Sequence, residues 1–96
     1  MSDIVSAAVE ALNKRLDGQG FDGVAKFVIE GEGNIVIDEN GAHAGDEPAD
    51  VTLTANTDTF QQILEGDLNP TSAFMSGRLA VDGDMGAAMR LGGVLS

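Results

Sequence analysis

The amino-acid sequence predicts an α+β domain in which helices cover one face of a five-stranded, largely antiparallel sheet. Apolar residues alternate with polar ones between residues 24 and 55, which is typical of strands, and they recur at helical spacing on either side of that region. Glycine- and asparagine-containing turns separate the alternating segments. A last alternating segment, residues 78–82, lies between two helical ones.

The first element is predicted to be an amphipathic helix. One side of it carries the apolar residues Ile4, Ala8, Ala11, Leu12 and Leu16. Ser2 or Asp3 is expected to cap its start and Gly18 to end it.

Four strands should follow. Residues 24–30 and 34–38 are expected to form a hairpin across a glycine-containing turn. Asn40-Gly41 predicts a second hairpin with a type I′ turn, since both central residues of that turn need positive φ. A short strand at 42–44 ends before Pro48, and residues 50–55 supply the fourth strand with Val51, Leu53 and Ala55 directed inward.

From residue 56 onward, the sequence predicts two helices, a strand and a last helix. Thr57 or Asp58 is expected to cap the first of these helices, which ends at Gly66. Pro70 fits the first turn of a short helix that Gly77 ends, and Asp84 should cap the last helix after a strand at 78–82. Gly92-Gly93 is interpreted either as a C-terminal cap or as a hinge that lets the Val94-Leu95 tail lift to admit a ligand.

Length and composition limit the range of possible functions. Ninety-six residues fit one domain, residues 1–96, whose core should consist mainly of Val, Ile, Leu, Ala and Met. The net charge of −11 repels phosphate backbones and anionic bilayers, so we expect no nucleic-acid partner and at most transient membrane contact. There is no cysteine, signal peptide or membrane-spanning segment in the sequence, which predicts a cytoplasmic location and leaves the oligomeric state open.

No motif predicts a metal, a cofactor or catalysis. The acidic segment 30–50 contains hard oxygen ligands, but starting from Asp38 it places Ala42 and His43 where a calcium loop needs a ligand and glycine. His43, the only histidine, has no recognised nucleophile motif near it. The glycine-rich segment 31–41 precedes a strand and so cannot aim a helix N-terminus at a phosphate.

The remaining candidates for a functional site are the apolar side chains of the last 37 residues. These side chains could simply form the core, and for any single residue this is the stronger interpretation. As a set they favour a binding site, because Met75, Met85 and Met89 would make an adaptable lining for ligands of variable shape.

The same region resembles the signature of the sterol carrier protein 2 (SCP2) domain family, in the form of a small stand-alone bacterial-type member. The matching residues, with unbroken spacing, are Leu64, Gly66, Leu68, Pro70, Ala73, Phe74, Gly77, Arg78, Leu79, Gly83 and Met85. The resemblance implies an apolar tunnel that holds a fatty acid, acyl chain, sterol-like or isoprenoid lipid, with no catalytic residues. Carried over by position, the lipid-binding residues would be Phe60, Leu64, Phe74, Met75, Leu79, Val81, Met85, Met89 and Leu91.

Two departures from the family pattern bear on the ligand. Ala80 and Asp82 stand where relatives often have basic residues, which leaves Arg78 alone in that strand and puts binding of a CoA phosphate in doubt. The chain ends in Val94-Leu95-Ser96 and not in a peroxisomal tripeptide of the Ser-Lys-Leu type.

Two functions therefore stand open. The leading one is non-enzymatic lipid binding and transfer. The alternative is an accessory module that presents a lipid, or an acidic docking surface at residues 30–50, to a partner enzyme such as one of isoprenoid quinone biosynthesis. A third, an enzyme that depends on His43, has no reaction to support it.

Overall fold

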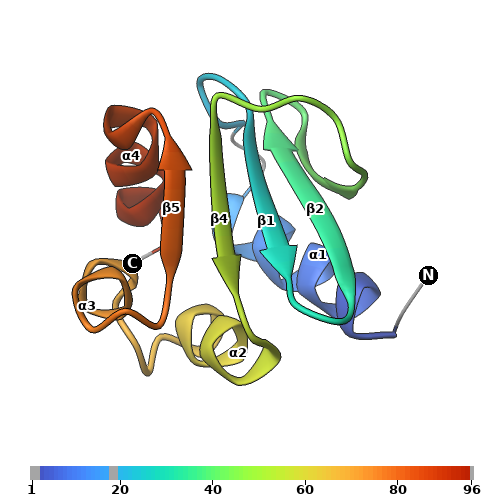
Figure 1. Ribbon diagram of the computed structural model, residues 1–96. Coiled ribbons are helices and arrows are strands. Elements are labelled where there is room, and N and C mark those ends of the chain that lie inside the picture. The colour runs from blue at the N-terminus through green and yellow to red at the C-terminus, as the bar shows by residue number, and fades with distance from the viewer. Residues whose placement is uncertain (1–2, 18–19, 96) are drawn as a thin grey trace.

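The computed structural model describes residues 3–17 and 20–95, with the backbone alone for residues 94 and 95. Helices and strands alternate in groups, as expected for an α+β fold (Figure 1). In chain order they are α1 (Asp3–Leu16), β1 (Ala25–Ile29), β2 (Gly33–Asp38), β3 (Gly41–Ala44), β4 (Val51–Ala55), α2 (Thr57–Glu65), α3 (Pro70–Met75), β5 (Ala80–Gly83) and α4 (Met85–Leu95).

The five strands form one sheet in the order β3-β2-β1-β4-β5. Three neighbouring pairs are antiparallel and the β1–β4 pair is parallel. Phe27 of β1 lies opposite Ile35 on one side and Leu53 on the other, so the apolar alternation of the three central strands is in register. The predicted sheet is confirmed, including its largely antiparallel character.

The helices cover one face of this sheet. Helix α1 packs on β2 and β3, α4 packs on β1, β4 and β5, and the two helices contact each other. The strand residues on this face, among them Ala25, Phe27, Val51 and Leu53, are almost fully buried. The ring of Phe27 packs edge to face against the ring of Phe60 in α2, with the ring centroids 4.9 Å apart. This aromatic pair lies in the core between the sheet and the helices.

The core differs from the prediction in one respect. The buried apolar residues of the described chain are Val, Ala, Leu, Ile and Phe, and no methionine is among them. Met75, Met85 and Met89 are all exposed, and Phe74 is also 42% exposed. The prediction of a methionine-containing core was therefore wrong, because Ala87 and Leu91 fill the side of α4 that faces the sheet.

The turn between β2 and β3 also differs. Asp38 pairs with Gly41, so Glu39 and Asn40 are the central turn residues and Asn40-Gly41 are not. Asp17 is the only non-glycine residue with positive φ in the described chain, whereas Gly41 has φ 106°. An Asp38 side-chain oxygen accepts a hydrogen bond from the Asn40 N–H, 2.9 Å, which stabilises this turn without a left-handed asparagine. The hairpin is confirmed and its type I′ turn is not.

The described helix ends agree with the sequence prediction except at the start of α2. Asp84 caps α4 as predicted, since its Oδ1 accepts from the Gly86 N–H at 2.9 Å. Helix α2 ends at Gly66, which takes a left-handed conformation. Its N-cap, however, is Asn56 and not Thr57 or Asp58: Asn56 Oδ1 accepts from the Thr59 N–H at 2.8 Å. The expected end of α1 at Gly18 lies outside the described residues.

Replacement of Asn56 by alanine should lower the free energy of unfolding by about 1 kcal/mol, because the Thr59 N–H loses its partner at the helix start. Thr57→Ala is the matched control and should cost less, since Thr57 does not cap the helix. Urea unfolding of the three proteins measures the difference. A larger loss for Thr57→Ala would contradict the assignment of the cap.

Helix α4 continues through Gly92-Gly93 to Leu95, so the glycine pair is not a C-terminal cap. A Cβ added at Gly92 would lie 3.9 Å from the Pro70 side chain, in ordinary van der Waals contact. Whether the end of α4 opens for a ligand stays a prediction. None of the described helices combines the length and the apolar character needed to cross a bilayer.

Candidate functional site

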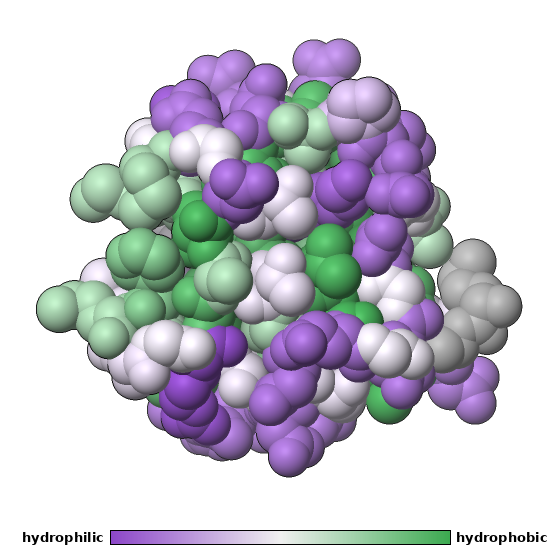
Figure 2. All heavy atoms as spheres, in the orientation of Figure 1, coloured by the Kyte–Doolittle hydropathy of each residue, from purple (hydrophilic) through white to green (hydrophobic). Residues whose placement is uncertain are grey.

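An apolar hollow of about 270 Å³ lies between β4, β5, α3 and α4. We call it the C-terminal hollow. Six of the predicted lipid-binding residues line it: Phe74, Met75, Leu79, Val81, Met85 and Met89. On this side of the molecule hydrophobic side chains reach the surface together, over α3, β5 and α4 (Figure 2).

Local sequence explains how α3 contributes to this hollow. Pro70 fits the first turn of α3, and Asn69 Oδ1 accepts from the Thr71 N–H at 2.8 Å. After the helix, the Leu79 N–H bonds back to the Ala73 carbonyl at 3.1 Å, which turns the chain sharply toward β5. Leu79 is thereby buried at the floor while Phe74 and Met75 stay at the rim.

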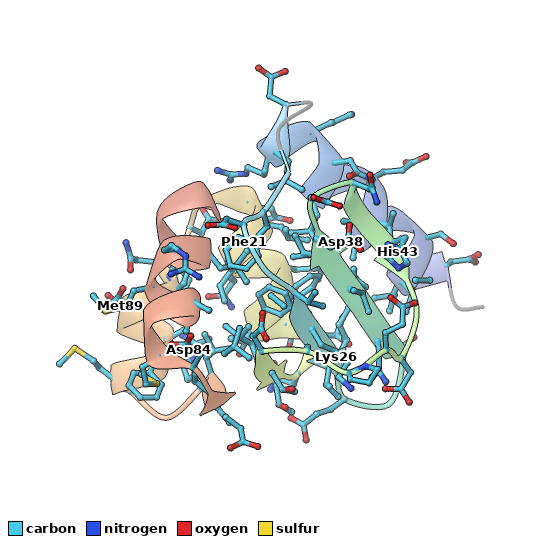
Figure 3. The ribbon with its side chains drawn as sticks, turned by 90° about the horizontal axis from the view of Figure 1, so that it is seen from above. Phe21, Lys26, Asp38, His43, Asp84 and Met89 are labelled. Carbon is cyan, nitrogen blue, oxygen red and sulfur yellow. The ribbon has the colours of Figure 1, made fainter. Side chains whose placement is uncertain are left out.

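Helix α4 supplies the opposite wall by its periodicity. Met85, Ala88, Met89 and Gly92 have the spacing i, i+3, i+4 and i+7, which places them on one helical face. Met89 is 76% exposed, and Figure 3 shows it on the outer side of α4, away from the sheet. Large apolar side chains exposed around a hollow are the feature expected of a surface that binds an apolar partner.

A second hollow of about 310 Å³ lies between α1 and α2. We call it the N-terminal hollow. Its α1 wall is formed largely by small side chains, Ala7, Ala8 and Ala11, which leave space in front of Phe60 and Leu64. A hydrogen bond links the two helices: Arg15 Nε of α1 donates to the Leu64 carbonyl of α2 at 3.1 Å.

The nine predicted residues are thus not one continuous lining. Phe60 and Leu64 belong to the N-terminal hollow, and no residue is common to both hollows. Leu91 lines neither and is fully buried in the core. Ala88 and Gly92 also line the C-terminal hollow, and their spacing from Met85 in the sequence could have indicated them. Leu53 joins the lining only because β4 lies next to β5 in the sheet.

The only histidine lies on the opposite side of the molecule from α4 (Figure 3). His43 Nε2 is 3.1 Å from Glu47 Oε2, and with Asp38 these residues offer three ligand atoms within 4.8 Å of one another. Both side chains of the His43–Glu47 contact are about half exposed, which is typical of a solvated surface contact. Neither hollow includes them.

Beside this group, Lys26 forms an ion pair with Asp46 on the sheet face opposite the helices, at 2.9 Å. The hydrogen bond from Lys26 and its positive charge lower the pKa of Asp46 below its ordinary value of 3.8. The stabilising effect is therefore present above that ordinary pKa and is lost as the pH falls through the lower, folded-state value.

Lys26→Met should return the pKa of Asp46 toward 3.8, because the interactions that favour its charged form are removed. Carboxyl-detected NMR titration of both proteins measures this pKa directly. Asp38, on the neighbouring strand β2, provides an internal comparison in the same spectra. An Asp46 titration unchanged by Lys26→Met would show that the ion pair does not form in solution.

Residues 5–96 match the family model described as the SCP-2 sterol transfer family. The chain belongs to this family. Among curated proteins it is similar to hydroxysteroid dehydrogenase-like protein 2 of Xenopus tropicalis, with 35% identity over 92% of this chain and 23% of that protein. The chain spans about a fifth of the length of the first such relatives.

Solved structures of the family share the fold. Sterol carrier protein 2 of Aedes aegypti in complex with palmitate matches all of this chain and 97% of its own, with 25% identity and a TM-score of 0.77. Sterol carrier protein 2 like 2 from Aedes aegypti matches 95% of each chain with 21% identity and a TM-score of 0.78. The SCP2-like α+β fold predicted from the sequence is confirmed.

Proposed function

We propose that this domain of the SCP-2 family binds and transfers lipids, and that the C-terminal hollow is where it holds the apolar chain. The observation that carries the proposal is the exposure of Phe74, Met75, Met85 and Met89 around a concave apolar floor. The volume is close to the lower end of the roughly 300–1,000 Å³ range of small-molecule pockets. The palmitate complex of the Aedes aegypti relative supports a lipid as the occupant.

The expected affinity is moderate. Burial of ~12 methylenes contributes roughly 10 kcal/mol at about 0.8 kcal/mol each. Association costs at least about 4 kcal/mol, so a tail alone would bind with a Kd of roughly tens of micromolar or weaker. A single methylene changes binding by only ~1–3 kcal/mol, so chain length would be poorly discriminated.

We further propose a cytoplasmic carrier with no catalytic residues of its own. The relatives named as dehydrogenase-like are much longer than this chain, which supports supply of lipid to an enzyme on the same or another polypeptide. The acidic docking surface at residues 30–50 has weaker support, because Asp46 is engaged by Lys26 and Glu47 by His43. Retention of a candidate enzyme unchanged by Glu39→Gln, Asp46→Asn and Glu47→Gln together would remove that surface from the proposal.

A fluorescent long-chain alcohol tests the binding itself, because its uncharged head isolates the contribution of the tail. Delipidated protein should bind it saturably with one site per chain. Ala88→Phe should weaken this binding at least tenfold by filling the C-terminal hollow, whereas Ala7→Phe places the same side chain in the N-terminal hollow and serves as the control.

Absence of saturable binding would overturn the carrier function. Loss caused by Ala7→Phe, with Ala88→Phe unaffected, would keep the function and move the ligand to the hollow between α1 and α2. Both variants must first show unfolding transitions close to the parent protein.

A further inference from the structure

Three side chains that can ligate a metal ion converge far from both hollows. They are Asp38 of β2, His43 of β3 and Glu47 of the segment between β3 and β4. Each offers one ligand atom, and the three atoms lie within 4.8 Å of one another. In the described part of the chain, no other group of three histidine or acidic side chains is placed in this way.

The strand register places two of these residues on one face of the sheet. His43 lies opposite Val36, and Asp38 follows two residues after Val36 on the same strand, so the two side chains point to the same side. Diagonal neighbours of this kind are about 7–8 Å apart at Cα, within reach of an aromatic side chain such as histidine. Figure 3 shows Asp38 and His43 near each other, on the side away from α4.

The segment that carries Glu47 is held against this face. The Gly45 N–H donates to the Asn34 carbonyl of β2 at 3.2 Å. One residue further on, Asp46 pairs with Lys26 of β1 at 2.9 Å. Glu47 follows directly, so its backbone is positioned before any ion arrives, which lowers the entropy cost of ligation.

The contact between His43 and Glu47 has the length expected for two ligands of one ion. His43 Nε2 lies 3.1 Å from Glu47 Oε2. Two ligand atoms about 2.0–2.1 Å from a tetrahedral zinc ion are about 3.3–3.4 Å apart. Asp38 Oδ1 accepts from the Asn40 N–H at 2.9 Å, which orients the carboxylate and leaves its other oxygen to act as a ligand.

Gly45 provides the space in which Glu47 meets His43. A Cβ added at Gly45 would lie 2.8 Å from Glu47 Oε1 and 3.5 Å from His43 Cδ2. Gly45 is not among the glycines with positive φ, so its backbone conformation does not by itself require glycine. The missing side chain is instead what allows the two ligands to approach each other.

We propose that Asp38, His43 and Glu47 form a surface site for a divalent metal ion, and that zinc is the ion that matches it best. One imidazole nitrogen and two carboxylate oxygens are ligands that zinc takes, with water as the fourth. Calcium and magnesium prefer sites made of oxygen alone. The net charge of −11 favours cations near the surface, and the nearby charge of Lys26 is balanced by Asp46.

The bound ion would join β2, β3 and the segment after β3, and so stabilise the fold. This inference goes beyond the proposed lipid binding and does not depend on it, because neither hollow includes these residues.

Isothermal titration calorimetry with zinc chloride tests the site, on metal-free protein without a polyhistidine tag. One ion should bind per chain, and excess calcium should not displace it. Saturating zinc should raise the midpoint of thermal unfolding, because the ion binds the folded state. In nitrogen-15 NMR spectra, the Nε2 resonance of His43 should shift when zinc is added, which reports ligation in the parent protein without any substitution.

Variants locate the ion. His43→Gln and Glu47→Gln should each weaken zinc binding at least about tenfold, since each removes a ligand. Glu30→Gln is the matched control, because it removes one carboxylate from the turn at the other end of the β1–β2 hairpin from Asp38 and should leave the affinity unchanged. Gly45→Ala tests the geometry: the added Cβ displaces Glu47 and should also weaken binding. Thermal unfolding in EDTA shows that each variant folds.

A single zinc site that His43→Gln removes and Glu30→Gln retains would support the proposal. Absence of saturable zinc binding would overturn it. Several weakly bound ions that His43→Gln leaves in place would overturn it as well, since the acidic surface as a whole would then hold them. An Nε2 resonance of His43 that zinc does not move would exclude the histidine as a ligand, whatever the variants do.

Discussion

Leu91→Ala should lower the free energy of unfolding by about 2–5 kcal/mol, the range for truncation of a fully buried leucine. The side chain is 0% exposed and belongs to the core cluster between α4 and the sheet. Against a total stability of about 5–15 kcal/mol for a native domain, this is a large fraction. Urea unfolding followed by circular dichroism measures it.

Met89→Ala is the matched control on the same helix. Because Met89 is 76% exposed, the change should stay within about 0.5 kcal/mol. The pair thus separates a core residue of α4 from a residue of the hollow, although both came from the same apolar run of sequence. Equal losses for the two variants would contradict the packing of α4 described here.

Met75→Gln combined with Met89→Gln should weaken lipid binding roughly thirtyfold, or about 2 kcal/mol at 1.4 kcal/mol per tenfold. These side chains are 80% and 76% exposed, so their apolar surface is available for burial by a ligand. Full burial of a methionine side chain contributes about 1.5–3 kcal/mol. Each of the two substitutions is expected to remove part of that contribution to lipid binding. Displacement of the fluorescent alcohol measures the affinity.

The unfolding free energy of this double variant should change little, since glutamine and methionine have similar length and helix propensity. Leucine at both positions should retain most of the binding and controls for shape. A loss of stability as large as the loss of binding would indicate that the two methionines are core residues. Unchanged binding would exclude them from the ligand site.

Element order and strand location were predictable because they depend on local chemistry. The alternation in residues 24–30 and 50–55 required strands, and Asp84 before an apolar run required a helix start. The errors were shifts of a residue or so, at Asn56 and in the turn at Glu39-Asn40. At such places, two or three adjacent residues could each serve as the cap or the turn residue. Which of them does so depends on backbone hydrogen bonds that form only in the folded chain.

The candidate site divides in the same way. The spacing of the apolar residues makes α4 apolar on more than one side, with Met85 and Met89 on one face and Ala87 and Leu91 on another. At 100° per residue Leu91 lies about 200° around the helix from Met89, so the two cannot share a surface. Which of the two faces is buried depends on long-range packing: β5 pairs with β4 at the edge of the sheet, and α4 packs on these strands with Leu91 inward. The methionine face is then turned toward α3 and β5, where it lines the C-terminal hollow and its side chains stay exposed.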